Sequence, residues 1–169
     1  MHKKNRRGSS LVEFVLVGVP SIFLIISVVE IGRGMWNYHT LARAVNVGAR
    51  MAAVHGQGCT IGANTCTVSV GTIATAIQTA GIGLLTSNFN LQLTTASGAV
   101  TTCNPISACT GSTTTWPPAT NNDNVAGRNV TISAQYSFNS LLAMFWPGVG
   151  ASTFGPYTFP AATTQPILF

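Results

Sequence analysis

A long apolar run near the N-terminus sets the strongest limit on how this chain can fold. Residues 11–31 read LVEFVLVGVPSIFLIISVVEI, and the stretch 14–29 carries no charge. With its flanks, the run approaches the roughly 20 residues that a helix needs to cross a bilayer. A cleaved secretory signal is the alternative, because a basic segment precedes the run, but no small-residue cleavage site follows it. We therefore expect a retained, single-pass membrane helix.

The helical pattern continues beyond the apolar run. Small or apolar residues recur on one helical face at every third or fourth position, at Leu41, Val45, Gly48 and Ala52. This spacing predicts one helix over residues 11–54, about 66 Å long and about twice the apolar thickness of a bilayer. Pro20 lacks a backbone N–H and is expected to kink or loosen this helix.

The remaining sequence predicts a small α+β domain. A short amphipathic helix is expected over residues 71–85, and alternating apolar and polar residues predict strands near 89–93 and over 130–138. Residues 94–129 are rich in Thr, Ser and Asn and are expected to form one long loop. Prolines in the tail limit any strand near 157–159 to a short one at a sheet edge.

Three segments are expected from these patterns. They are a basic leader over residues 1–8, a transmembrane and extended helix over 9–54, and an extracytoplasmic α+β domain over 55–169.

The distribution of charge argues against nucleic-acid binding. The net charge is +5, but Lys3, Lys4, Arg6 and Arg7 all lie in the leader. From residue 51 onward the only charged side chains are Asp123 and Arg128. No basic patch is available there to neutralise phosphates. The leader instead suits a positive-inside anchor with a cytoplasmic N-terminus.

The titratable residues also argue against catalysis. After His55 the chain has no His, Lys or Glu, so a serine or threonine nucleophile would lack a usual base. Asp123 alone cannot form a carboxylate pair, and His2, His39 and His55 have no neighbouring acid at metal-ligand spacing. We expect no enzyme activity, no metal, no cofactor and no small-molecule substrate.

Four cysteines follow the apolar run: Cys59, Cys66, Cys103 and Cys109. None shows the C-x-x-C spacing of a zinc or redox site. Their even number and short gaps favour two local disulfide loops, joining the first to the second and the third to the fourth, although inert buried thiols remain an alternative. Disulfides would place this part of the chain outside the cytoplasm.

The segment Gly8-Ser9-Ser10-Leu11-Val12-Glu13-Phe14, after a basic leader, resembles the processing site of type IV prepilin-like proteins. The wider N-terminal run resembles the TadE-like family of pseudopilins from tight-adherence pilus systems. Four motifs carry this resemblance: Val12-Glu13-Phe14, Pro20, Glu30-Ile31-Gly32-Arg33 and Gly48-Ala49-Arg50.

The resemblance implies a minor pseudopilin in the bacterial inner membrane that helps to assemble, prime or cap a pilus. Its partners would be lipid, other pilin-like subunits, the pilus assembly machinery and a prepilin peptidase. The peptidase would cut after Gly8, so that the mature chain starts at Ser9 with Glu13 at its fifth position. Glu13 and Phe14 would then be assembly residues.

The position of Glu13 has a physical interpretation within this resemblance. An ionised side chain facing hydrocarbon costs about 2 to 3 kcal/mol at mid-membrane and less near the interface, so Glu13 needs a partner. The resemblance implies that it pairs with the new amino group at Ser9 of a neighbouring subunit. The alternative is an interfacial glutamate that extends toward the headgroups.

Other residues of the predicted helix have simpler structural explanations. Glu30 and Arg33 are spaced for an i,i+3 pair at the outer membrane edge, and Arg50 lies farther along the extended helix. Gly48 and Ala52 are expected to pack against the chain's own domain. A second hypothesis for the whole protein is a permanently anchored surface-binding protein, in which the 94–129 loop contacts a ligand or a cell surface.

Overall fold

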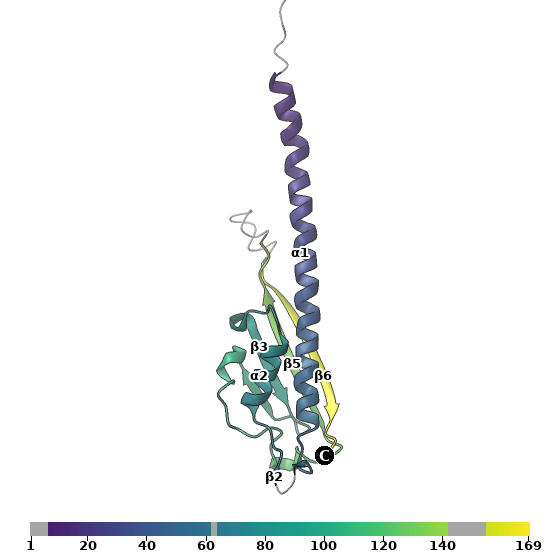
Figure 1. The fold of residues 1–169 in the computed structure, drawn as a ribbon, viewed down its shortest axis with the longest axis vertical. Helices are drawn as coiled ribbons and strands as arrows, with labels where there is room; N and C mark the ends of the chain where they lie inside the picture. The colour runs from purple at the N-terminus through teal and green to yellow at the C-terminus, as the bar shows by residue number, and fades with distance from the viewer. Residues whose placement is uncertain (1–6, 62–63, 142–154) are drawn as a thin grey trace, which may run out of the picture. The chain divides into compact units, whose positions relative to one another are not determined.

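The computed structural model describes residues 7–61, 64–141 and 155–169 (Figure 1). In chain order its elements are α1 (Arg7–Ala53), β1 (Thr60–Ile61), β2 (Asn64–Thr65), α2 (Val70–Ala80), β3 (Phe89–Thr94), β4 (Val100–Cys103), β5 (Asn129–Phe138) and β6 (Tyr157–Pro166). A long N-terminal helix, a short second helix and an antiparallel sheet confirm the predicted α+β class.

The chain divides into two compact units. The N-terminal unit comprises Met1–Met35 with Ser140–Gly155, and the sheet unit comprises Trp36–Asn139 with Pro156–Phe169.

In the N-terminal unit, α1 is helical through Pro20. It begins at Arg7, four residues before the predicted start. Two serine hydroxyls donate to carbonyl oxygens one turn earlier, Ser21 to Val17 and Ser27 to Phe23, each at 2.8 Å. Polar groups are thus bonded within the helix, as a lipid environment requires. Leu11–Ala53 is long and apolar enough to span a membrane, with a mean hydropathy of 2.5 in its most apolar stretch.

In the sheet unit, four strands form an antiparallel sheet in the order β4-β3-β5-β6. The central strands β3 and β5 pair from Phe89 opposite Tyr136 to Thr94 opposite Thr131. Both show the predicted alternation of buried and more exposed residues. The buried residues of these two strands form one face of the core: Phe89, Leu91, Leu93, Val130, Ile132, Ala134, Tyr136 and Phe138.

Helix α2 and the C-terminal part of α1 pack on this buried face. The four residues whose spacing predicted an internal face of α1 are all buried, as expected: Leu41, Val45, Gly48 and Ala52. A Cβ atom at Gly48 would lie 2.5 Å from Cγ1 of Ile77 in α2 and 3.6 Å from Cδ1 of Ile132 in β5. The absence of a side chain at Gly48 therefore allows α1 to approach α2 closely.

The ends of α2 follow from local chemistry. The Ser69 hydroxyl caps its N-terminus by accepting from the Thr72 amide at 3.1 Å. The helix ends at Ala80, earlier than the predicted residue 85, because Gly81 follows as the C-cap and Gly83 adopts a positive φ of 87°.

Two predictions for the sheet need correction. The segment 94–129 is not one long loop, because Val100–Cys103 forms the edge strand β4 against β3. The tail strand β6 is ten residues long rather than short, although it does lie at an edge as predicted. An edge strand pairs on one side only, so it tolerates Pro160 and Pro166 where their missing N–H groups are not needed for pairing.

Candidate functional site

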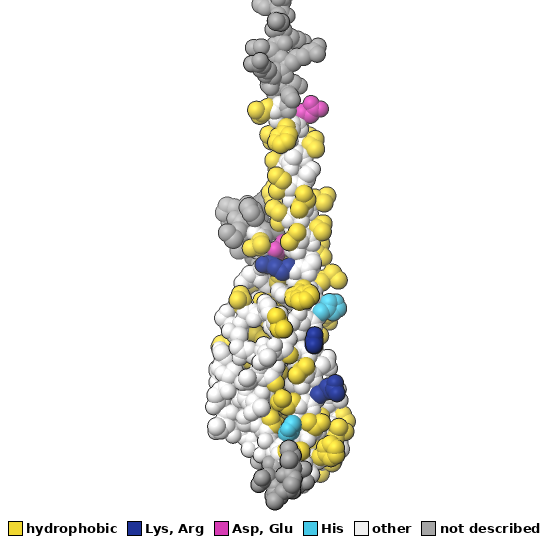
Figure 2. Space-filling model, viewed as in Figure 1, with side chains coloured by type: hydrophobic (Ala, Val, Ile, Leu, Met, Phe, Trp, Pro, Cys, Tyr) yellow, Lys and Arg dark blue, Asp and Glu magenta, His cyan; other side chains and the backbone are white. Residues whose placement is uncertain are grey.

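The predicted processing and assembly residues lie at the start of α1. Gly8 and Ser9 belong to its first turn. Glu13 and Phe14 are both exposed. Among the residues that the structure describes, no hydrogen bond or ion pair reaches Glu13. Hydrophobic side chains cover this stretch of helix with few charges among them (Figure 2). Glu13 is thus an outward-facing acid on an apolar surface.

Glu30 has a different environment. It is only 6% exposed, and its Oε2 accepts from the Arg33 guanidinium at 3.2 Å, so the expected i,i+3 pair is present. The same oxygen also accepts from the backbone N–H of Leu141 at 3.2 Å. This contact within the N-terminal unit joins α1 to a segment 111 residues later in the chain. No local sequence pattern indicates it.

Arg50 lies exposed in the last turn of α1. A cation at this end of a helix interacts favourably with the unpaired carbonyl groups and the helix dipole. Its position therefore has a structural explanation that needs no partner.

Two disulfides stabilise the sheet unit. They join Cys59 to Cys66 and Cys103 to Cys109, with Cα–Cα distances of 5.4 and 5.5 Å. This is the pairing that sequence order favours. Cys103 is fully buried in the core at the end of β4, so its disulfide fixes the following 3₁₀ turn, Ile106–Ala108, against the sheet.

The two charged residues of the chain beyond residue 51 contact one another. Asp123 is buried, and its carboxylate accepts from the Ser97 amide at 2.9 Å and from the Ser97 hydroxyl. Nη2 of Arg128 lies 3.8 Å from Oδ1 of Asp123. Burial by itself raises the pKa of Asp123, but hydrogen bonds from Ser97 and Thr95 and the charge of Arg128 hold the pKa below its ordinary value. This cluster fixes the 95–99 turn.

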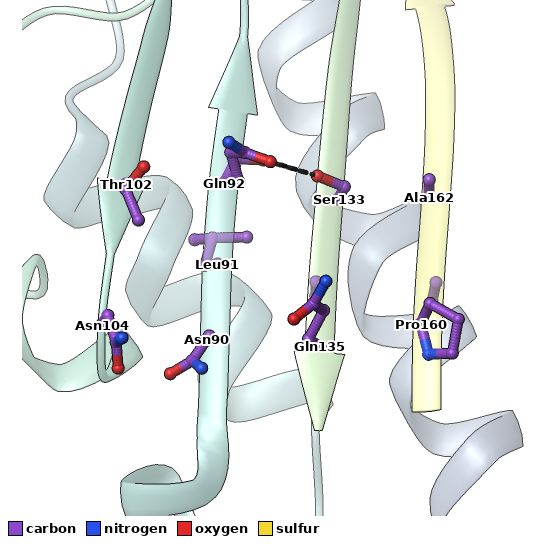
Figure 3. A pocket seen from close by; sticks show the side chains of 11 residues that line it. Asn90, Leu91, Gln92, Thr102, Asn104, Ser133, Gln135, Pro160 and Ala162 are labelled. Atoms are coloured by element: carbon purple, nitrogen blue, oxygen red, sulfur yellow. Dashed lines mark hydrogen bonds between the residues drawn. The ribbon is translucent and has the colours of Figure 1, made fainter. Parts of the chain in front are cut away.

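A groove of about 570 Å³ crosses the face of the sheet opposite the helices. Figure 3 shows its polar side chains directed away from the helices, with Gln92 accepting from the Ser133 hydroxyl at 3.4 Å. Amides and hydroxyls line it together with small apolar groups: Asn90, Gln92, Asn104, Gln135, Thr102, Ser133 and Pro160. These groups donate and accept hydrogen bonds but supply neither a general base nor a charge. The groove could therefore hydrogen-bond a polar ligand.

The described residues also contain no group of three or more His, Cys, Asp or Glu side chains that could hold a metal ion.

The family model described as TadE-like protein matches residues 8–50. This part of the chain is similar to that family, and we call it the TadE-like segment. The match confirms the resemblance noted from the sequence and contains Gly8, Glu13, Glu30 and Arg50. No curated protein and no solved structure matches the chain.

The TadE-like family comprises pilin-like proteins associated with tight-adherence pili, and residues 8–50 are similar to it. The one long apolar helix of the described chain is compatible with a single-pass membrane anchor.

Proposed function

We propose that this protein is a minor pseudopilin of a tight-adherence pilus system. In this proposal α1 inserts into the bacterial inner membrane with its N-terminus in the cytoplasm, and a prepilin peptidase removes residues 1–8. Residues 9–54 then form the mature transmembrane and extended helix, and residues 55–169 form the extracytoplasmic domain. The mature protein helps to assemble, prime or cap the pilus.

The observation that supports this proposal is the isolated carboxylate of Glu13. The other acid of the helix, Glu30, has partners within its own unit, whereas Glu13 is exposed among apolar side chains without one in the described chain. Because an unpaired ionised carboxylate is unfavourable near hydrocarbon, a cationic partner would stabilise it. Cleavage after Gly8 creates such a cation, the α-amino group of Ser9.

If the Ser9 amine that pairs with Glu13 belongs to a neighbouring subunit, the pair forms only when the subunits assemble. The Glu13 charge would then favour the assembled state and set the axial register of the packed helices. Ser9 also precedes Glu13 by four residues, about one turn of the same helix. The amine of the same chain is therefore the competing partner.

The test is co-purification with pilin-like subunits from membranes. Glu13→Ala and Glu13→Gln should insert into the membrane as the wild type does but lose co-purification. Glu13→Asp keeps the charge and is the matched control. This variant should retain most of the co-purification. Unchanged co-purification of Glu13→Ala would refute the role of the interchain pair.

The groove favours a second candidate, a permanently anchored surface-binding protein. Two of its lining residues, Thr102 and Asn104, belong to the 94–129 segment, which in this candidate contacts a ligand or a cell surface. A native chain that keeps residues 1–8 would support this candidate and oppose the first.

A further inference from the structure

Three large apolar side chains of the sheet unit are exposed close to one another. Trp36 in α1 is 65% exposed, and Ile82 and Leu85, in the loop after α2, are 73% and 63% exposed. A Cβ atom at Gly83 would lie 3.8 Å from Nε1 of Trp36, so this loop lies beside the indole. We call these three residues the Trp36 patch.

The backbone of the loop explains why its side chains face outward. Gly81 ends α2, and Gly83 adopts the left-handed conformation that side chains disfavour. Leu84 is buried in the core, while Ile82 and Leu85 on either side of the turn are not. Burial of large apolar side chains is favourable, so their clustered exposure indicates a surface that is covered in use.

The position of Trp36 in the chain indicates what covers the patch. It follows Ile31, the last residue of the apolar run, by five residues. Even fully extended, five residues span at most about 17 Å. Trp36 is therefore always held close to the bilayer surface if α1 spans the membrane. An indole is favoured there because its apolar ring and N–H suit the boundary between acyl chains and headgroups.

We propose that the Trp36 patch docks on the outer surface of the bilayer that α1 spans. Ile82 and Leu85 enter the headgroup boundary beside Trp36, so the outer domain is held by a second contact besides its helix. None of the three side chains carries a charge that would oppose this insertion. The inference rests on the proposed membrane span, and the experiment below reports on the two separately.

The test uses the full chain in phosphatidylcholine–phosphatidylglycerol nanodiscs with single spin labels. All described cysteines are in disulfides, so an introduced thiol can be labelled selectively without a reducing agent. Ile82→Cys probes the patch, and Leu24→Cys, in the apolar run, probes the span. Val100→Cys is the matched control: it is 51% exposed and pairs with Thr94, at the end of β3 far from Leu85. Accessibility to oxygen and to a water-soluble nickel chelate is measured at each position.

We expect the labels at positions 82 and 24 to be more accessible to oxygen than to nickel, and the label at position 100 to show the reverse order. A label at position 82 that behaves like the one at position 100, while position 24 remains lipid-exposed, would overturn the docking inference alone. A position-24 label exposed to nickel would overturn the membrane span and the docking with it. Protection of position 82 from both reagents would show a protein contact and also overturn the inference.

A second measurement keeps the native loop intact. In a Trp146→Phe background, which retains Trp36 and Trp116, brominated lipids should quench part of the tryptophan emission, and adding Trp36→Phe should remove that quenched part. Trp116 is buried in the core and provides an internal reference. Equal fractional quenching with and without Trp36→Phe in this background would contradict the docking.

Discussion

Adding a methyl group at Gly48 tests the close approach of α1 and α2. The new Cβ atom would lie 2.5 Å from Cγ1 of the fully buried Ile77. Overpacking of this kind costs about 1 to 3 kcal/mol. Alanine in place of glycine within a helix returns about 0.5 to 1 kcal/mol. We therefore expect Gly48→Ala to lower the free energy of unfolding by about 1 kcal/mol and the melting temperature by about 4 °C.

The assay is urea and thermal unfolding of the full chain in detergent, followed by near-UV circular dichroism of the core aromatics. Gly111→Ala is the control, since a Cβ atom there meets nothing within 4 Å, and its stability should stay close to that of the wild type. Ile77→Val removes Cδ1, one of the two Ile77 atoms that the new Cβ atom would clash with. Gly48→Ala should then be less destabilising than in the wild type, which a double-mutant cycle measures.

A Gly48→Ala protein that is more stable than the wild type would refute this reasoning. It would show that helix propensity outweighs packing, and hence that α1 and α2 are not in tight contact at this position. The G-A-R element of the TadE-like segment would then have to serve something other than internal packing.

Three further predictions concern the sheet unit. Because hydrogen bonds and Arg128 hold the folded-state pKa of Asp123 below its ordinary value of 3.8, its stabilising contribution is present above about pH 4 and lost as the pH falls. Urea midpoints between pH 2 and 7 should show this loss, and Asp123→Asn should flatten it. Arg128→Gln should cost under about 1 kcal/mol in urea unfolding at neutral pH, because the guanidinium is partly exposed. Replacing Cys103 and Cys109 by serine should cost about 2 kcal/mol from loop entropy alone, and an unchanged urea midpoint would contradict this.

Periodic local patterns predicted the elements that depend on local chemistry. The spacing of Leu41, Val45, Gly48 and Ala52 predicted the buried face of α1, and strict alternation predicted β5. The outward polar residues of β3 and β5 followed from the same alternation.

Non-local contacts could not be predicted in this way. The strand β4 has a short Val-Thr-Thr-Cys sequence without a clear period, and it forms because Leu91–Thr94 offers an edge for pairing. The bond from Leu141 to Glu30 joins residues far apart in the chain. The groove needs four strands in register, so its amides and hydroxyls could be predicted as exposed but not as neighbours.

The central claim is that the Glu13 carboxylate is neutralised by an amino group that proteolysis creates at Ser9. The most direct measurement is the intact mass and N-terminal sequence of the protein extracted from the membranes of piliated cells. The account predicts a chain that begins at Ser9. A chain that retains residues 1–8 in cells with normal pili would contradict it, because no amine would then exist at that position to pair with Glu13.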